Sequence, residues 1–376
     1  MDMDFTPEQE LLRDSVRRTC ARHGGLDLAR KLENDAVGYS PALWSALDEL
    51  GLLGLTLPEE HGGSGMSMLD AAIVYEELGR ALVPSPHFVS CVLSAGVLTR
   101  SGDEALQQAW LPRLAAGEAV MTVAWLEPGG GFGAGGIQLT ATPTGDGYVL
   151  DGVKQHVPFA RASDALLTLA RSPDGVVLLV VDAGAPGLSL EQQLTVASDT
   201  QYLVTFDGVA VPSDGVVRMA ADPWSCWHDT MLDGAILLAA QAVGGARAAL
   251  ELTVDYAQKR EQFDRPLGAF QAIAHYLADA TAAVDGTQTL VWEAAWARAE
   301  GRPVDRLAPM SKLYAGKTFR EVTAMAVQVF GGNGFTLDFD VQLYFRRAKS
   351  LQLNYWDDRH LEHLIADEVL GPVGVS

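Results

Sequence analysis

The sequence contains very little cysteine. Cys20, Cys91 and Cys226 are the three cysteines in 376 residues, an odd and widely spaced set. Such a set argues against a disulfide framework and fits a reducing compartment, so a cytoplasmic protein is expected. None of the three stands in the Cys-x-x-Cys spacing of a metal ligand pair, and no metal site is predicted.

Positive charge is scarce as well. The chain has 27 Lys+Arg against 48 Asp+Glu, which gives a formal net charge of −21 at pH 7. A surface of that sign repels phosphate backbones, so the sequence does not predict a nucleic-acid-binding protein. It also requires that any anionic ligand be held by a local basic pocket.

Long apolar runs are missing. No uninterrupted apolar stretch approaches the roughly 20 residues of a membrane span, and the acidic, polar residues 1–9 do not have the pattern of a signal peptide. Hydrophobic residues nevertheless make up 48% of the chain. That share is ordinary for a globular protein with a real core, and the length allows two or three domains.

Hydrophobic periodicity divides the chain into three parts. Residues 1–118 have helical spacing, residues 119–218 contain short β-branched runs bounded by turn residues, and residues 219–376 contain long stretches rich in Ala and Leu. We therefore predict a mainly α fold: an N-terminal helical domain, a middle β domain and a C-terminal helical bundle. Within the β domain, Asp151-Gly152 is predicted to be the turn of a hairpin.

Two segments of the C-terminal part have the residue types of a phosphate site. Arg260-Glu261-Gln262-Phe263 is followed by a turn with Pro and Gly, and such an arginine can direct a fork of donors at a diphosphate. Gly331-Gly332-Asn333-Gly334 allows backbone N–H groups to approach phosphate oxygens closely. Alone, the glycine segment would equally fit a helix C-cap and turn.

These segments carry a family resemblance. Arg260–Gln271 resembles the acyl-CoA dehydrogenase signature R-x-Q-F-x-x-P-[IL]-x-x-F-Q, and Gln328–Phe335 resembles the family's Q-x-x-G-G-x-G-[YF]. Leu57–Gly63, with Glu76–Arg80 in the next helix, is a third match. The helix–β–helix order agrees too, so the resemblance covers nearly the whole chain.

The resemblance implies FAD as cofactor and α,β-dehydrogenation of an acyl-CoA thioester as the reaction. Electrons would pass to an acceptor such as an electron-transfer flavoprotein. It implies a small β-barrel or sandwich as the middle domain and a four-helix bundle as the last. In this family the ADP half of FAD lies across a subunit interface. The residues that the resemblance assigns to it are Arg260, Gln262, Phe263, Phe270, Gln271, Gln328, Gly331, Gly332 and Asn333.

The catalytic motifs of the family are not retained. The usual carboxylate base lies in Y-E-G-T after R-x-A-K, but here Arg346–Lys349 is followed by Gln352–Asp358, without the Glu or the Gly-Thr. The alternative Glu-Arg on an earlier helix aligns with Gly234-Ala235. No catalytic residue is therefore predicted at the usual positions, and Asp357 and Asp358 are the weak candidates.

The motifs on the flavin-ring side are altered in the same way. The family's T-E-P-x-A-G-S-D is replaced by Leu126-Glu127-Pro128 and a glycine run, without the Ser-Asp. In K-x-W-I-[ST]-N, the Trp that flanks the ring is His156 and the hydroxyl residue is Pro158, which lacks both a hydroxyl and a backbone N–H.

The ADP-side motifs are retained, whereas the catalytic and ring-side motifs are altered. Three interpretations follow from this difference. The chain could supply the ADP-side half of the FAD site to a homologous catalytic subunit, as in bacterial α2β2 enzymes of the family, including those that act on steroid side chains. It could be an active homo-oligomer that uses Asp357 or Asp358 as base. It could also be a flavin-free acyl-CoA-binding or scaffold protein.

Overall fold

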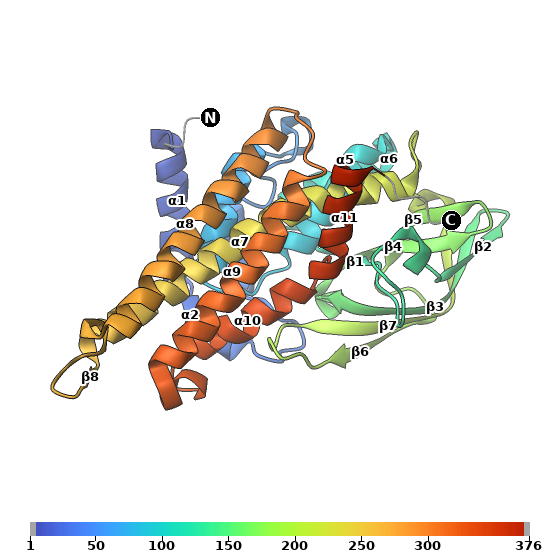
Figure 1. Cartoon of the computed structure of the whole chain (residues 1–376). Coiled ribbons are helices and arrows are strands. Elements are labelled where there is room, and N and C mark those ends of the chain that lie inside the picture. Colours follow the sequence, from blue (N-terminus) through green and yellow to red (C-terminus); the bar gives the residue numbers. More distant parts are fainter. Residues whose placement is uncertain (1–4, 372–376) are drawn as a thin grey trace. The chain divides into compact units, whose positions relative to one another are not determined.

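The computed structural model describes residues 5–371, which form helices, one large sheet and a small hairpin (Figure 1). The α-helices are α1 (Pro7–Arg22), α2 (Gly25–Lys31), α3 (Pro41–Asp48), α4 (Met68–Arg80), α5 (Ala95–Ser101), α6 (Glu104–Ala115), α7 (Pro223–Lys259), α8 (Gln271–Ala299), α9 (Leu307–Phe330), α10 (Val341–Leu353) and α11 (Asp358–Leu370). The strands are β1 (Met121–Ala124), β2 (Thr140–Thr144), β3 (Gly147–Pro158), β4 (Ala165–Ser172), β5 (Gly175–Asp182), β6 (Leu188–Gln193), β7 (Gln201–Pro212), β8 (Glu261–Gln262) and β9 (Arg265–Pro266). This order confirms the predicted fold class.

The contacts divide the chain into two compact units. Unit 1 combines residues 1–29, 67–83 and 235–376, and unit 2 combines residues 30–66 and 84–234. Sequence-distant segments thus share a unit, since α1 and α4 join the C-terminal helices while α3, α5 and α6 join the sheet. Helix α7 begins in unit 2 and continues into unit 1 from Ala235.

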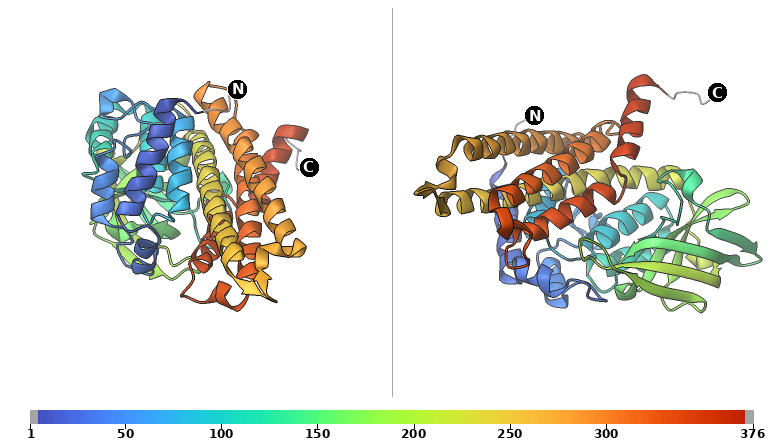
Figure 2. Two further views of the ribbon diagram at one scale, coloured as in Figure 1. Left: turned by 90° about the vertical axis from the view of Figure 1, so that its left-hand side faces the viewer. Right: turned by 60° about the horizontal axis from the view of Figure 1, so that its bottom comes forward.

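Unit 1 is a bundle of helices in which α4 contacts both α1 and α8, and α9 contacts α8, α10 and α11. Helices α8 and α9 lie side by side in every view (Figures 1 and 2). Helix α1 begins at Pro7, because Thr6 and Gln9 form a reciprocal capping box with Pro7 at the first helical position.

Glycines permit a close crossing of two helices in unit 1. A Cβ at Gly244 of α7 would lie 1.8 Å from the carbonyl oxygen of Glu76, and one at Gly79 of α4 would lie 2.0 Å from that of Gln241. The backbones of α4 and α7 are therefore in direct contact, which only residues without a Cβ allow.

Unit 2 is built on a mixed seven-stranded sheet in the order β1-β4-β2-β3-β7-β6, with β5 paired to β4. One of the β-branched runs expected in residues 119–218, Val176–Val181, forms the centre of β5, where valine and leucine side chains are largely buried. The core of this unit contains aromatic and aliphatic side chains from β3, β4, β5 and β7, among them Tyr202 and Phe206.

The predicted hairpin turn at Asp151-Gly152 is wrong. These residues lie inside β3, at a register shift between Leu150 and Gly152, and Gly152 has φ of 140°. The actual turn is Gly145-Asp146, because Thr144 pairs with Gly147. A turn dipeptide and a bulge both need a residue free to adopt positive φ, so the local sequence does not distinguish them.

Among residues 5–371, α7 is the one helix long and apolar enough to cross a membrane by length and composition. Of its most apolar 18-residue stretch, 78% is buried inside the protein, as in a core helix, which makes it weak grounds for a membrane span.

Candidate functional site

The predicted ADP-side arginine follows the last residue of α7. The backbone N–H of Arg260 donates to the carbonyl of Tyr256 at 2.8 Å, and the carbonyl of Arg260 accepts from Leu267 N–H at 2.8 Å. The backbone is thus held at both sides while the side chain is exposed. Within residues 5–371 its guanidinium makes no hydrogen bond or ion pair, so its donors are available to a ligand.

The hairpin after Arg260 consists of β8 and β9. Its two central residues, Phe263 and Asp264, have φ of 53° and 61°, the conformation of a tight two-residue hairpin turn. The ring of Phe263 is 87% exposed, an unusual position for an apolar side chain. Gln262 is exposed beside it, and Gln271 is exposed at the start of α8.

The glycine segment forms the turn that ends α9. Gly331 has φ of 62°, which explains the requirement for glycine there, and Gly331 and Gly332 are both exposed. Gln328 is exposed in the last turn of α9. A Cβ at Gly331 or Gly332 would meet no atom within 4 Å, so the backbone is open to an approaching group.

Tyr256 connects these two segments, and the sequence analysis did not single it out. Its hydroxyl accepts from the side-chain amide of Asn333 at 3.2 Å, and its ring stacks on Phe330 at 4.1 Å. The end of α7 is thereby fixed to the end of α9, and the two predicted ADP-side motifs lie at one end of the bundle. An aromatic residue one helical turn before Arg260 was the available signal.

Phe270 has a structural contact that the motif alone does not indicate. The guanidinium of Arg265 lies 3.9 Å from the centroid of the Phe270 ring, and Phe263 approaches the same ring at 6.2 Å, edge on. This cation–π contact stabilises the hairpin. The structure thus places all nine predicted ADP-side residues in two adjoining segments of unit 1.

The two candidate base residues have structural partners. Asp357 is the N-cap of α11 and its carboxylate accepts from His360 N–H at 2.9 Å. The carboxylate of Asp358 accepts from the Gln352 side-chain amide at 2.6 Å. Both carboxylates are therefore held by local hydrogen bonds of the kind that begin and fasten a helix.

The loop before α11 is held by a buried lysine. Lys312 of α9 is 1% exposed and its ammonium donates to the carbonyls of Trp356 at 2.8 Å and Leu351 at 3.3 Å. Tyr355 and Trp356 both have positive φ, 53° and 77°. Burial lowers the pKa of Lys312 to about 7, against the opposing effect of the Asp358 and Asp357 carboxylates.

In the altered ring-side motifs, Glu127 and Lys154 form a buried pair within unit 2, with 2.6 Å between the carboxylate and the ammonium. The carboxylate of Glu127 also accepts from the backbone N–H groups of Gln138 and Leu139 at 2.9 Å. Burial lowers the pKa of Lys154 to about 8, and the carboxylate opposes this shift. The pair fixes the loop after β1 to β3.

His156 is exposed near the end of β3 in a left-handed conformation, with φ of 54°. Its Nδ1 lies 3.0 Å from the amide oxygen of Gln201, whose amide nitrogen donates to Asp199 at 2.8 Å. Because the amide oxygen can only accept, Nδ1 is the donor in this contact. Pro158, two residues later, has no N–H or O–H group and cannot donate a hydrogen bond.

Among the described residues, no group of three or more His, Cys, Asp or Glu side chains is arranged to hold a metal ion. The three cysteines are buried thiols, and burial raises the pKa of each.

Comparison with known proteins shows which family the chain resembles along its length. Residues 6–118, 122–209 and 224–354 match the N-terminal, middle and C-terminal domains of acyl-CoA dehydrogenase. The chain is 30% identical over 383 aligned residues to the probable acyl-CoA dehydrogenase YngJ of Bacillus subtilis, covering 98% of this chain and 100% of the relative.

Solved structures give the same result. The ChsE4–ChsE5 complex from Mycobacterium tuberculosis contains a chain that matches with a TM-score of 0.90 at 29% identity, covering 100% of both chains. A chain of the Tcur3481–Tcur3483 steroid ACAD matches with a TM-score of 0.85 at 32% identity, covering 97% of this chain and 99% of that one. The protein therefore belongs to the acyl-CoA dehydrogenase family, FAD-dependent oxidoreductases that act on the CH–CH bond of acyl-CoA thioesters.

Proposed function

We propose that this chain is the non-catalytic subunit of a heteromeric acyl-CoA dehydrogenase and supplies the ADP-side half of the FAD site to a homologous catalytic partner. The observation that carries the proposal is the contrast between two sets of motif residues. The ADP-side residues Arg260, Gln271, Gln328, Gly331 and Gly332 are all exposed and intact. The ligand-facing residues of the ring-side motifs are replaced.

On the ring side, the retained and the lost residues differ in what they do. Glu127 and Lys154, the retained Glu and Lys of the two motifs, form the buried pair that fastens β3 to its neighbour loop. Breaking such a pair typically costs about 3–5 kcal/mol, so fold stability alone accounts for both residues. Leu126, His156 and Pro158 stand at other positions of these motifs, and none of the three supplies a hydroxyl to a flavin ring.

The base region supports the same proposal. A general base must take a proton from the substrate, whereas Asp357 begins α11 and Asp358 is bound to Gln352. By contrast, residues that bind FAD phosphates need only be exposed and held in a fixed position. The hydrogen bond between Tyr256 and Asn333 holds the two ADP-side segments in position. FAD would supply the hydride-accepting flavin, and this chain's part would be to bind and orient the diphosphate.

Two of the matched structures suggest the partner and the substrate class. ChsE4–ChsE5 is a complex of two differently named chains, and Tcur3481–Tcur3483 is a steroid ACAD named in the same way. We infer an α2β2 assembly in the cytoplasm that acts on a bulky acyl-CoA such as a steroid side chain. Its electrons would pass to an acceptor such as an electron-transfer flavoprotein.

The test is flavin stoichiometry. The chain is purified alone and after co-expression with a family member of the same organism that retains the Glu base and the ring-side motifs, and FAD absorbance is compared with subunit number by gel filtration and native mass spectrometry. We expect little FAD and no turnover for the chain alone, and one FAD for every two subunits in the complex.

Each other outcome has a clear meaning. One FAD per subunit with turnover in a homo-oligomer would contradict the proposal and favour Asp357 or Asp358 as base. Absence of flavin from every assembly would contradict it in favour of a flavin-free scaffold.

A further inference from the structure

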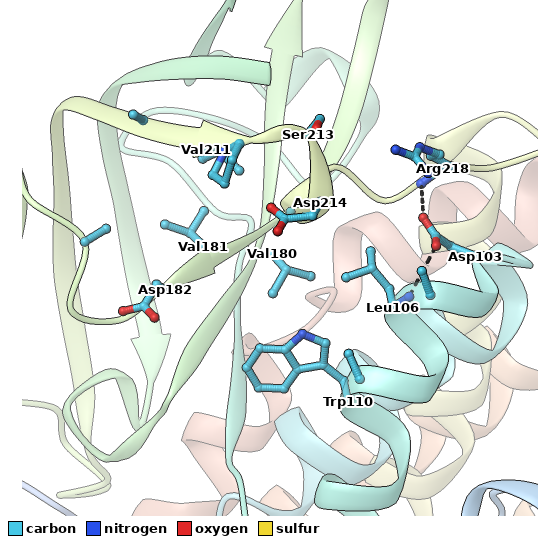
Figure 3. Close-up of a pocket in the computed structure, with 16 residues that line it drawn as sticks. Asp103, Leu106, Trp110, Val180, Val181, Asp182, Val211, Ser213, Asp214 and Arg218 are labelled. Atoms are coloured by element: carbon cyan, nitrogen blue, oxygen red, sulfur yellow. Dashed lines mark hydrogen bonds between the residues drawn. The ribbon is translucent and has the colours of Figure 1, made fainter. Parts of the chain in front are cut away.

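A groove in unit 2 is separate from every motif considered above. It lies between α6 and the ends of β5 and β7, with a volume of about 430 Å³ (Figure 3). That volume is within the range of small-molecule sites. Its lining includes Asp103, Leu106, Trp110, Asp182, Asp214 and Arg218.

One wall of the groove is apolar. Leu106 and Trp110 are one helical turn apart on α6, so both side chains project to the same side. Figure 3 shows the indole of Trp110 close to Val180 of β5, and Val180 and Val211 are both buried. The guanidinium of Arg113 lies 5.0 Å from the Trp110 ring, so this indole already accepts a cation.

The polar groups of the groove differ in how many hydrogen-bond partners they already have within the protein. Asp103 is buried and its carboxylate accepts from the backbone N–H groups of Leu106 and Arg218 at 3.2 and 3.1 Å. Asp182 uses one oxygen to accept from Gly184 N–H at 2.7 Å, which leaves the other. The side chains of Asp214 and Arg218 have no partner within residues 5–371.

We propose that this groove binds a small organic cation, a protonated amine attached to an apolar body. Asp214 would pair with the ammonium group, Asp182 would add to the negative potential of the groove, and the body would lie against Trp110 and Leu106. The carboxylate of Asp103, which is already held by two backbone hydrogen bonds, adds negative potential without needing to move. Three carboxylates, those of Asp103, Asp182 and Asp214, line the groove, against the guanidinium of Arg218 in its lining and that of Arg113 on the Trp110 ring, so the groove carries more negative than positive charge.

Charge complementarity decides against an anionic ligand. In the lining of the groove an anion could pair with Arg218, since the guanidinium of Arg113 lies on the Trp110 ring, and it would meet the carboxylates of Asp182 and Asp214 in the same groove. The whole chain, at −21, adds to that repulsion. An apolar body without charge would leave both carboxylates unpaired beside it.

The test uses three probes of nearly equal size: 2-phenylethylamine as cation, 3-phenylpropanoate as anion and phenylalanine as zwitterion. Binding to the full chain, and to the complex if one forms, is measured by calorimetry and ligand-detected NMR. We expect saturable binding of the amine, at least about fivefold tighter than either carboxylate-bearing probe.

Variants locate the binding. Asp182→Asn with Asp214→Asn should weaken amine binding about three- to tenfold, and Arg218→Gln should strengthen it about twofold, because exposed ion pairs are individually weak. Asp146→Asn, in the β2–β3 turn of the same unit and outside the groove, is the matched control and should change nothing. Melting curves confirm that each variant is folded.

Three results would overturn the proposal: no saturable amine binding, equal or tighter binding of either carboxylate-bearing probe, or an equal effect of Asp146→Asn. None of these depends on flavin content or turnover, so the proposal stands or falls independently of the subunit role.

Discussion

At the residue scale, Arg260 differs from the other cations near the end of α7. Lys259 forms an ion pair with Asp255 and Arg265 lies on Phe270, whereas the guanidinium of Arg260 has no partner within residues 5–371. An arginine left unpaired in an acidic chain fits one that binds an anion supplied by another molecule.

Replacing Arg260 with Ala should weaken FAD retention about 10- to 150-fold in the assembled complex. The loss corresponds to a charged hydrogen bond of about 1.5–3 kcal/mol. Lys should restore retention only in part, because it keeps the charge but loses the fork. Flavin absorbance after gel filtration is the measurement, and Lys259→Ala is the matched control. Unchanged retention in Arg260→Ala, or an equal drop in both variants, would refute the role.

Asp357 gives a second prediction, because an N-cap and a catalytic base respond differently to substitution. Asp357→Asn should leave stability almost unchanged, since an amide oxygen also caps a helix, and Asp357→Ala should cost about 0.5–2 kcal/mol. Turnover of the complex should fall less than tenfold in either variant and in Asp358→Asn. Loss of a true base would cost about 10²–10⁴-fold, so a collapse of the rate in Asp357→Asn with normal folding would identify it as the base.

At the scale of elements, α4 and α8 are joined through the buried carboxyl of Glu76. Its oxygens accept from the indole of Trp292 at 2.6 Å and the amide of Gln288 at 2.7 Å. Burial raises the pKa of Glu76 from 4.5 to about 7, while these hydrogen bonds and Arg247 oppose the shift and Glu77 adds to it. The folded protein thus holds a proton that the unfolded chain releases at lower pH.

The sign of the pH dependence follows. Between pH 4.5 and about 7 the folded state binds more protons at this site, so the free energy of unfolding falls as pH rises. The difference in free energy of unfolding between Glu76→Gln and the unsubstituted protein should shift in favour of the variant by up to about 3 kcal/mol between pH 4.5 and 8. Urea unfolding at the two pH values measures it, with the exposed Glu293→Gln as control. A constant difference across this range would contradict the raised pKa.

The crossing of α4 and α7 gives a prediction about packing. Gly244→Ala should lower the free energy of unfolding by about 1–3 kcal/mol or more, because the added Cβ would meet the carbonyl oxygen of Glu76. Gly286→Ala, within α8 and without neighbours, should instead raise it by about 0.5–1 kcal/mol. Equal effects of the two changes on thermal unfolding would show that helix propensity, not the close approach, dominates.

At the scale of the whole molecule, the net charge of −21 opposes folding through self-repulsion. Raising NaCl from about 20 mM to about 300 mM shortens the Debye length to below about 10 Å, and this screens the repulsion. We expect Tm to rise by a few degrees, measured by circular dichroism. A fall in Tm would show that the surface ion pairs, which salt also weakens, contribute more than the excess of negative charge costs.

Two features of the site could not be predicted from the sequence. The roles of Tyr256 and Lys312 depend on contacts with residues far along the chain, Asn333 and Trp356. The two motifs that carry the ADP-side prediction were visible because their glycine, proline and arginine are constrained locally. Asp357 was considered as a base because a carboxylate in a loop gives no sign of which N–H it will cap.

The sequence by itself determined the fold class and the family, since periodicity, turn residues and motif spacing are local properties of the chain, and on the same motifs it predicts the ADP-side residues. The tertiary structure alone decided that Asp151-Gly152 lies within a strand and that Glu127 and Lys154 form a buried pair. It also decided that α4 and α7 meet through their glycines. These depend on which distant segments approach one another, because burial and partner choice are set only when the chain is packed.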